Sequence, residues 1–291
     1  MTSSTPAVPR TPDDVPGWFW KVDQDVFSWF LDRQTENGVT GNILELGTYL
    51  GRSAILLGRH LREGESFTIC DLFDSDAPDE ENSAEMEMSY RKTLTRKAFE
   101  TNYLAFHEEL PTVIQAPTSV LADGRIPAGS CRFVHIDASH LYEHVSGDIR
   151  VARDALAKDG LVVLDDYRSL HTPGVAAAVW EAVADAGLKP VCLTPEKFYG
   201  TWGDAEAAKA DFLAKGWPVA EGYKISEDVI AGGTVHRITW TEPAKSPAPQ
   251  PTPAPAAAPR PQRSAARRLA LDLLPPVATR AIRRTLAARR G

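Results

Sequence analysis

Short apolar runs alternate with segments of helical periodicity along most of this chain. The runs cover residues 43–46, 67–71, 113–115, 133–137, 161–165, 191–193 and 235–240, and each has the length of a buried strand. This alternation predicts an α/β, Rossmann-like fold: a mostly parallel seven-stranded sheet with helices on both faces. Such sheets bind ligands at the carboxyl ends of their strands. Apolar residues between two of the runs share one helix face, as in Leu141, Val145, Ile149, Ala152 and Leu156.

The two ends of the chain differ in composition from its middle. Residues 1–15, rich in Pro, Ser, Thr and Asp, predict a disordered N-terminus, and residues 16–242 predict the folded domain. Aromatic residues from Trp18 to Phe30 predict a helix packed on the sheet, with an aromatic ligand cage as the alternative. Residues 243–261 hold eight prolines and predict an extended linker. Residues 262–291 predict a basic, amphipathic tail.

Charge separates the tail from the body. From residue 260 onward the chain carries nine Arg and one Asp, a charge of +8, so the preceding residues carry −15 of the total of −7. An acidic body without a basic stripe speaks against nucleic acid as a partner. The tail could bind an anionic membrane surface. The sequence favours equally a solvated tail or a segment that docks on a protein. The sequence has no apolar run of the roughly 18 residues that span a bilayer.

These observations place the protein in the cytoplasm, with peripheral attachment at the inner membrane face as an open alternative. Its three cysteines, Cys70, Cys131 and Cys192, fall in strand-like segments and predict buried free thiols rather than a disulfide framework. The sequence leaves the oligomeric state open, a homo-oligomer included.

A glycine turn follows the first predicted strand in NILELGTYLGRSAILLGRHL. Gly47 and Gly51 allow the backbone to approach a ligand closely, and the helix that begins near Ser53 offers free N–H groups. Glu45 lies inside the strand, where a carboxylate favours a cationic group of the ligand over a phosphate. Asp71 ends the second strand, a position that accepts hydrogen bonds from a ribose. Together they predict a site for a nucleoside with a cationic arm, although such a turn also serves strand-to-helix packing.

Carboxylates end two further predicted strands, Asp137 after one and Asp165 with Asp166 after the next. Adjacent strands lie about 5 Å apart, so the three carboxylates converge beside the nucleoside site and repel unless a positive group lies among them. A divalent cation, most simply Mg²⁺, would balance their charge, so the three carboxylates predict a metal site. His140 is then a candidate base for a substrate hydroxyl, with a structural role at a helix start as its alternative. His135 is interpreted as a core histidine, and Glu143 and Asp148 as helix-surface charges.

The motifs LELGTYLGRS, CDLFD, FVHIDASHLYEHVSGDI and GLVVLDDY resemble those of class I S-adenosylmethionine-dependent methyltransferases, and within them the macrocin-type, metal-dependent sugar O-methyltransferases. The resemblance covers residues 40 to 185. It implies that the turn binds the methionine part of the cofactor and Asp71 its ribose, beside Asp137. It also implies Mg²⁺ at Asp137, Asp165 and Asp166, and His140 as base. Adenine contacts are expected near Thr118 and Ser119. The implied turn residues are Glu45, Gly47, Thr48, Gly51 and Ser53.

The expected reaction is transfer of a methyl group to a hydroxyl of a small molecule or glycan. Three alternatives remain at this point: a nitrogen acceptor without metal, a cofactor-binding scaffold whose tail acts on a membrane or partner, and an NAD-dependent oxidoreductase. The oxidoreductase expects GxGxxG, whereas the spacing here is GxxxG. The segment 83–110 and the loop after Asp166 are expected to shape the acceptor pocket.

Overall fold

Nine strands form one sheet in the computed structural model, which describes residues 8–90, 93–214, 216–230 and 232–240. The strand order is β3-β2-β1-β4-β5-β7-β6-β9-β8. Strands β3 to β5 of that order run parallel to one another, and β7 pairs antiparallel with both β5 and β6. The strands are β1 (Asn42–Leu46), β2 (Phe67–Asp71), β3 (Thr112–Gln115), β4 (Cys131–Ile136), β5 (Leu156–Leu164), β6 (Lys189–Leu193), β7 (Phe198–Thr201), β8 (Tyr223–Ile230) and β9 (Gly233–Trp240).

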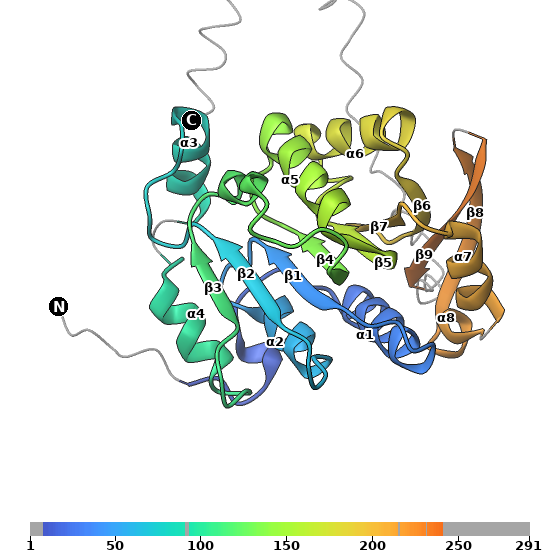
Figure 1. Ribbon diagram of the computed structural model, residues 1–291, viewed down its shortest axis with the longest axis horizontal. Coiled ribbons are helices and arrows are strands. Elements are labelled where there is room, and N and C mark those ends of the chain that lie inside the picture. The colour runs from blue at the N-terminus through green and yellow to red at the C-terminus, as the bar shows by residue number, and fades with distance from the viewer. Residues whose placement is uncertain (1–7, 91–92, 215, 231, 241–291) are drawn as a thin grey trace, which may run out of the picture. The chain divides into compact units, whose positions relative to one another are not determined.

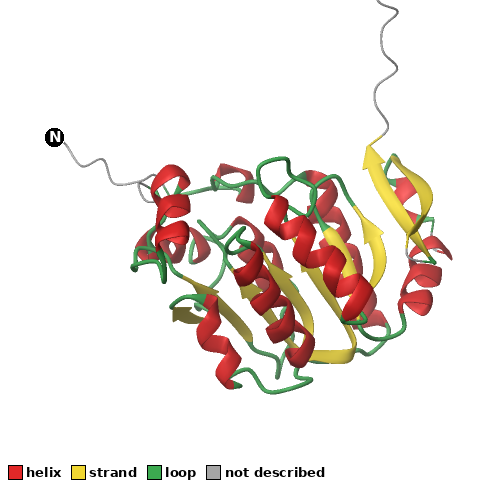
Figure 2. Cartoon of the chain, turned by 90° about the horizontal axis from the view of Figure 1, so that it is seen from above, coloured by secondary structure: helices red, strands yellow, loops and turns green. Residues whose placement is uncertain are grey.

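Helices cover both faces of the sheet, and each face has its own apolar core (Figure 1). Helices α1, α2, α4 and α7 contribute to one core, and η2, α5 and α6 to the other. Figure 2 shows these layers from above, with the strands between the helices. The expected two-sided α/β fold is therefore confirmed. The helices are η1 (Pro12–Asp14), α1 (Lys21–Glu36), α2 (Arg52–Arg59), α3 (Glu80–Ser89), α4 (Arg96–Tyr103), η2 (Thr118–Asp123), α5 (Tyr142–Ala155), α6 (Pro173–Asp185), α7 (Ala205–Ala214) and α8 (Trp217–Ala220).

Two strands, β7 and β8, were not predicted. Strand β7 has only four residues, Phe198–Thr201, and a glycine among them, so its pattern is too short to identify. Strand β8 lies at the edge of the sheet and is nowhere fully buried, which gives it the mixed sequence YKISEDVI. The sheet therefore has nine strands where seven were expected, and the predicted run 235–240 falls within β9.

Ordered structure begins earlier than the predicted boundary at residue 16. Pro12–Asp14 forms a short 3-10 helix, and Val15 is fully buried. Asp13 pairs with Arg52 at the start of α2, which ties this segment to the domain. Residues 1–7, the predicted linker 243–261 and the predicted tail 262–291 lie outside the described residues. Within the described residues, no helix is long and apolar enough to cross a membrane.

Most of the aromatic residues near the N-terminus belong to the core, as expected. Phe27 and Phe30 are buried and pack against Tyr199 of β7. Trp18 and Trp20 differ, because 65% and 52% of their surfaces remain exposed. The three cysteines are buried and free, which confirms that prediction.

Candidate functional site

A cavity of about 790 Å³ opens at the carboxyl ends of the central strands. Its size is within the range of small-molecule and cofactor sites. It lies between the turn after β1, the end of β2, the loop after β3 and the β4–α5 junction, with α3 and residues 16–20 along its rim. Parallel strands end at the same edge of a sheet, which is why residues more than a hundred positions apart line one space. The turn contributes Gly47, Thr48, Tyr49, Arg52 and Ser53.

Gly47 is required by the close approach of two strand ends. Its φ is +77°, and a Cβ there would lie 2.1 Å from the carbonyl oxygen of Asp137. Gly51, with φ +93°, precedes α2, and a Cβ there would meet the ring of Phe99 at 2.9 Å. Both glycines therefore serve the packing of the turn, and Gly47 also brings the turn against the residue that ends β4.

Asp71 holds the turn through its carboxylate. Its Oδ2 accepts the backbone N–H groups of Thr48 at 2.7 Å and Tyr49 at 3.1 Å, and its Oδ1 accepts that of Phe73 at 2.6 Å. Burial raises the pKa of Asp71 to about 6, against the effect of these three donors. A carboxylate has about four acceptor positions, so one remains for a ribose hydroxyl. Sequence reasoning predicted the ligand role and missed the structural one.

Glu45 lies beneath the cavity rather than on its wall. It is fully buried, and its Oε1 accepts the Nδ1–H of His135, its neighbour on β4, at 2.8 Å. Its Oε2 has no hydrogen-bond partner. Burial raises the pKa of Glu45 to about 7, while the hydroxyls of Ser53 and Thr48 and the charge of Lys197 act in the opposite direction. A buried carboxylate behind the turn fits the expected attraction for a cationic group in the cavity.

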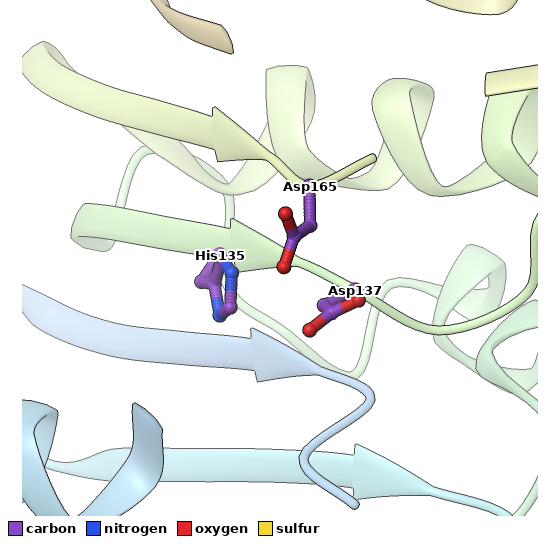
Figure 3. Close-up of side chains that lie close together, drawn as sticks. All are labelled: His135, Asp137 and Asp165. Atoms are coloured by element: carbon purple, nitrogen blue, oxygen red, sulfur yellow. The ribbon is translucent and has the colours of Figure 1, made fainter. Parts of the chain in front are cut away.

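Asp137, Asp165 and Asp166 lie at the same edge of the sheet, but they do not form one cluster: Asp165 and Asp166 belong to two separate groups that share Asp137. Asp137 follows His135 by two residues, and Asp165 directly follows β5. Period-two alternation therefore places the side chains of His135, Asp137 and Asp165 on one face of the sheet (Figure 3). Ligand atoms of His135, Asp137 and Asp165 lie within 4.8 Å of one another, as do those of Asp137, His140 and Asp166. Burial and the charge of Asp165 raise the pKa of Asp137 well above its ordinary value.

Positive groups already lie among these carboxylates: His140, which the sequence analysis singled out, and Lys197, which it did not. Lys197, in the turn between β6 and β7, forms an ion pair with Asp165. His140 lies between two carboxylates: its Nε2 is 3.0 Å from Asp166 Oδ2, and its Nδ1 is 2.5 Å from Glu85 Oε1. The argument that repulsion requires a metal ion therefore loses its force, because two side chains supply the compensating charge.

His140 is held as a cation in this arrangement. Burial lowers its pKa, but the hydrogen bonds to Asp166 and Glu85 outweigh that effect and raise the pKa to about 10. For Asp166, burial raises the pKa, but the hydrogen bonds from His140 and Ser169 outweigh that effect and lower the pKa to about 2. An imidazolium that donates from both nitrogens has no lone pair with which to accept a proton. Asp137 is thus better placed than His140 to serve as the base.

Glu85, on α3, lines the cavity and contacts His140, and sequence reasoning did not single it out. It also accepts hydrogen bonds from the Ser139 hydroxyl at 3.2 Å and from Asn82 at 3.0 Å. Most of the helix falls in the segment 83–110 that was expected to shape the acceptor pocket, and Glu85, Met86, Tyr90 and Leu94 of this segment line the cavity. Its acidic helix sequence, EENSAEMEMS, gave no signal that one glutamate faces inward.

Asp148 corrects the expectation of a helix-surface charge. It is 2% exposed, lines the cavity from α5, and its Oδ2 has no partner. Burial raises the pKa of Asp148 to about 7, against the effect of the Thr118 hydroxyl. Thr118 and Ser119 line the same part of the cavity, where adenine contacts were expected. Glu143 also lines the cavity.

Three aromatic side chains form a rim on the cavity, here called the aromatic rim: Trp18, Tyr49 and Tyr90. The ring centroid of Trp18 lies 5.6 Å from that of Tyr49 and 6.5 Å from that of Tyr90. Rings this close contact one another and leave no room for a cation between them, so they form a surface rather than a cage. Tyr49 has φ +50°, a conformation that its N–H bond to Asp71 helps to hold.

Residues 44–167 match the protein-family profile described as a methyltransferase domain. No curated protein matches the sequence significantly. Among solved structures, the chain is similar to the O-methyltransferase NovP, with 17% identity and a TM-score of 0.48, over 61% of this chain and 78% of that one. It is similar to CalS11, a TDP-rhamnose 3'-O-methyltransferase of calicheamicin biosynthesis, with 18% identity and a TM-score of 0.43, over 64% and 82%. A third, an O-methyltransferase from Bacillus cereus, has 15% identity and a TM-score of 0.43, over 65% and 84%.

Proposed function

Since residues 44–167 carry a methyltransferase domain, we propose that this chain transfers the methyl group of S-adenosylmethionine to a hydroxyl of a small molecule or glycan. The observation that carries the proposal is one cavity between the glycine turn and the strand-end carboxylates. Asp71 lines the cavity and supplies a hydrogen-bond acceptor for the ribose, while the carboxylate of Glu45 acts on the cofactor's cationic groups from behind the turn. Its adenine fits the part near Thr118 and Asp148.

The sulfonium methyl is already electrophilic, so the protein has to align the acceptor oxygen and remove its proton. Asp137 lies where the turn meets the end of β4, and its raised pKa makes it a stronger base than an ordinary carboxylate. The hydroxyl proton passes to its carboxylate oxygen while the C–O bond forms and the C–S bond breaks. His140, held by Glu85 and Asp166, provides a fixed positive charge beside the oxygen that gains the methyl group.

A magnesium ion at Asp137, Asp165 and Asp166 does not fit the donor set of this structure. Asp165 uses Oδ2 for Lys197 and Oδ1 for the backbone N–H of Asp166 at 2.9 Å. Asp166 uses Oδ2 for His140 and Oδ1 for the Ser169 hydroxyl at 2.6 Å. Two of these four partners, Lys197 and His140, are themselves cations, so a divalent ion at the same oxygens would be repelled by the positive charges already present. The expected metal therefore has no role in the proposed step.

The aromatic rim supports an acceptor that carries a ring. Trp18 is 65% exposed and lies at the cavity together with Tyr49 and Tyr90, and aromatic side chains gathered beside a cavity often mark ligand surfaces. A sugar ring or an aromatic ring can pack against Trp18 while its hydroxyl points toward Asp137. The rim thus favours ring-bearing acceptors over open-chain ones.

Calorimetric titration with S-adenosylmethionine tests the proposal, with NAD as the comparison ligand. We expect saturable binding of S-adenosylmethionine and none of NAD. Asp71→Asn should weaken that binding by at least tenfold, because the turn loses acceptors for its N–H groups, whereas Asp76→Asn, at an exposed position of the same loop, should not. Failure to bind S-adenosylmethionine would overturn the proposal.

A further inference from the structure

Lys197 is buried almost completely, with 1% of its side chain exposed. It lies in the turn that joins β6 to β7. Two hydrogen bonds of 2.9 Å close this turn: the backbone N–H of Thr194 donates to the carbonyl oxygen of Lys197, and the backbone N–H of Lys197 donates to the hydroxyl of Thr194. A lysine is seldom buried, because its ammonium loses hydration, unless other groups compensate for the charge. Its surroundings therefore indicate what the charge is for.

The ammonium has four partners of three kinds: a carboxylate, an imidazole and two aromatic rings. It forms an ion pair with Asp165, lies 3.2 Å from His135 Nε2, and sits over the rings of Phe19 and Phe27 at 5.5 Å and 5.8 Å. Lysine has only donors, so His135 Nε2 is the acceptor and its Nδ1–H points to Glu45. Burial and the charge of Lys197 lower the pKa of His135 well below its ordinary value, which agrees with a neutral ring.

The groups around the ammonium form the donor set of a metal site. His135, Asp137 and Asp165 each present a ligand atom within 4.8 Å of the others (Figure 3). One imidazole and two carboxylates are typical ligands of divalent transition metals. Two of the three, His135 and Asp165, contact Lys197 directly, and its charge acts on Asp137 as well. The ammonium thus contacts two of the three groups that could hold a metal ion and acts electrostatically on the third.

We propose that Lys197 is a built-in cation in place of a divalent metal at His135, Asp137 and Asp165, so that the site compensates its carboxylates without a bound ion. The inference about charge and metal binding stands apart from the proposed function. Only its consequence for catalysis, a methyl transfer that proceeds without metal, rests on that function. Removal of the ammonium should then turn the same three residues into a site for Mn²⁺.

The test is titration with Mn²⁺, followed by electron paramagnetic resonance of the free ion and by the melting temperature. Wild type should show no stoichiometric site. Lys197→Ala should bind one Mn²⁺ at least tenfold more tightly than wild type and melt at a higher temperature when the ion is present. Lys197→Arg keeps a positive charge and should resemble wild type. Lys209→Ala removes a lysine of similar burial, 5% exposed and paired with Glu206, and should create no site.

Each outcome decides the inference. A Lys197→Ala protein that folds only with Mn²⁺ supports it as strongly as one that folds without the ion and gains the site. Stoichiometric binding of Mn²⁺ by wild type, or a folded Lys197→Ala protein that binds no better than wild type, overturns it. The double variant with Asp165→Asn should lose the new site, which locates it. Titration of these proteins with S-adenosylmethionine reports on the proposed function separately.

Discussion

The two sides of the cavity obtain their order in different ways. On the turn side, Asp71 binds backbone N–H groups of residues close to it in space and in the same βαβ unit. On the strand-end side, each carboxylate is balanced by a side chain from a distant part of the chain: Asp165 by Lys197, and Asp166 by His140, which Glu85 also contacts. Local hydrogen bonds fix the first side, and long-range charge pairing fixes the second.

This difference explains what each side does. Backbone hydrogen bonds place the turn rigidly, as a site that recognises one invariant cofactor requires. Paired charges keep a cluster of acids stable without removing its field, which suits the side where a proton is transferred. The predictions below disturb one side at a time.

The largest effect is expected from Gly47→Ala on the turn side. The new Cβ would lie 2.1 Å from the carbonyl oxygen of Asp137, and the alanine would also have to adopt an unfavourable φ of +77°. We expect a loss of more than about 4 kcal/mol in the free energy of unfolding, measured by urea denaturation. Cofactor binding should disappear with it.

Gly64→Ala is the matched control, because Gly64 has φ +81° and nothing within 4 Å of an added Cβ. It should cost only the backbone conformation, about 1–2 kcal/mol. Equal losses in the two variants would show that the close approach of turn and strand end has no energetic weight.

The charge side predicts a pH effect that depends on His140. Its pKa is about 10 in the folded protein against an ordinary value of 6.5, so its contribution to stability is complete below pH 6.5 and is lost as the pH rises to 10. Between pH 6.5 and 10, the melting temperature of wild type should therefore fall more steeply than that of His140→Gln. The steeper fall reflects about one proton that folded wild type binds and the unfolded chain releases.

His107→Gln is the control for this series, because burial lowers the pKa of His107 and it stays neutral across that range. Its curve should run parallel to that of wild type. If His140→Gln also ran parallel, His140 would be neutral and available as a base, and the distinction between the two sides would fail at this residue.

A smaller and more selective effect is expected at the aromatic rim. Trp18→Ala should raise KM for a ring-bearing acceptor by about fivefold and leave the affinity for S-adenosylmethionine unchanged, since the aromatic contact is worth roughly 1 kcal/mol. Trp240→Ala, which removes a tryptophan that is 52% exposed on β9, should change neither. A loss of cofactor affinity in Trp18→Ala would place the rim on the cofactor side.

The smallest effect on the cavity is expected from truncation after Glu242. The arginine-rich segment should be dispensable for both sides of the cavity, so cofactor binding should not change. Sedimentation with anionic vesicles should be lost at low salt in the truncated chain, because Arg contributes about 1 kcal/mol near such a surface. Equal sedimentation of both chains would remove the membrane from the account.

Sequence reasoning predicted the turn side more fully than the strand-end side, for physical reasons. Gly47 and Asp71 on the turn side, and Asp137 on the strand-end side, each stand at a strand end, and hydrophobic periodicity identifies strand ends. Lys197 stands in an unassigned turn before the undetected strand β7, and Glu85 on a helix without an apolar stripe. Nothing local in the sequence reveals that these two point inward. Asp148 was placed on the surface because its helix face was assigned from apolar residues alone.

The structure of the complex with S-adenosylhomocysteine tests the central claim most directly. The account predicts the nucleoside over the Gly47 turn with its ribose at Asp71, its sulfur facing Asp137, and Lys197 still paired with Asp165 in a crystal grown with Mg²⁺. A ligand bound elsewhere, or a metal ion at Asp165 with Lys197 displaced, would contradict it.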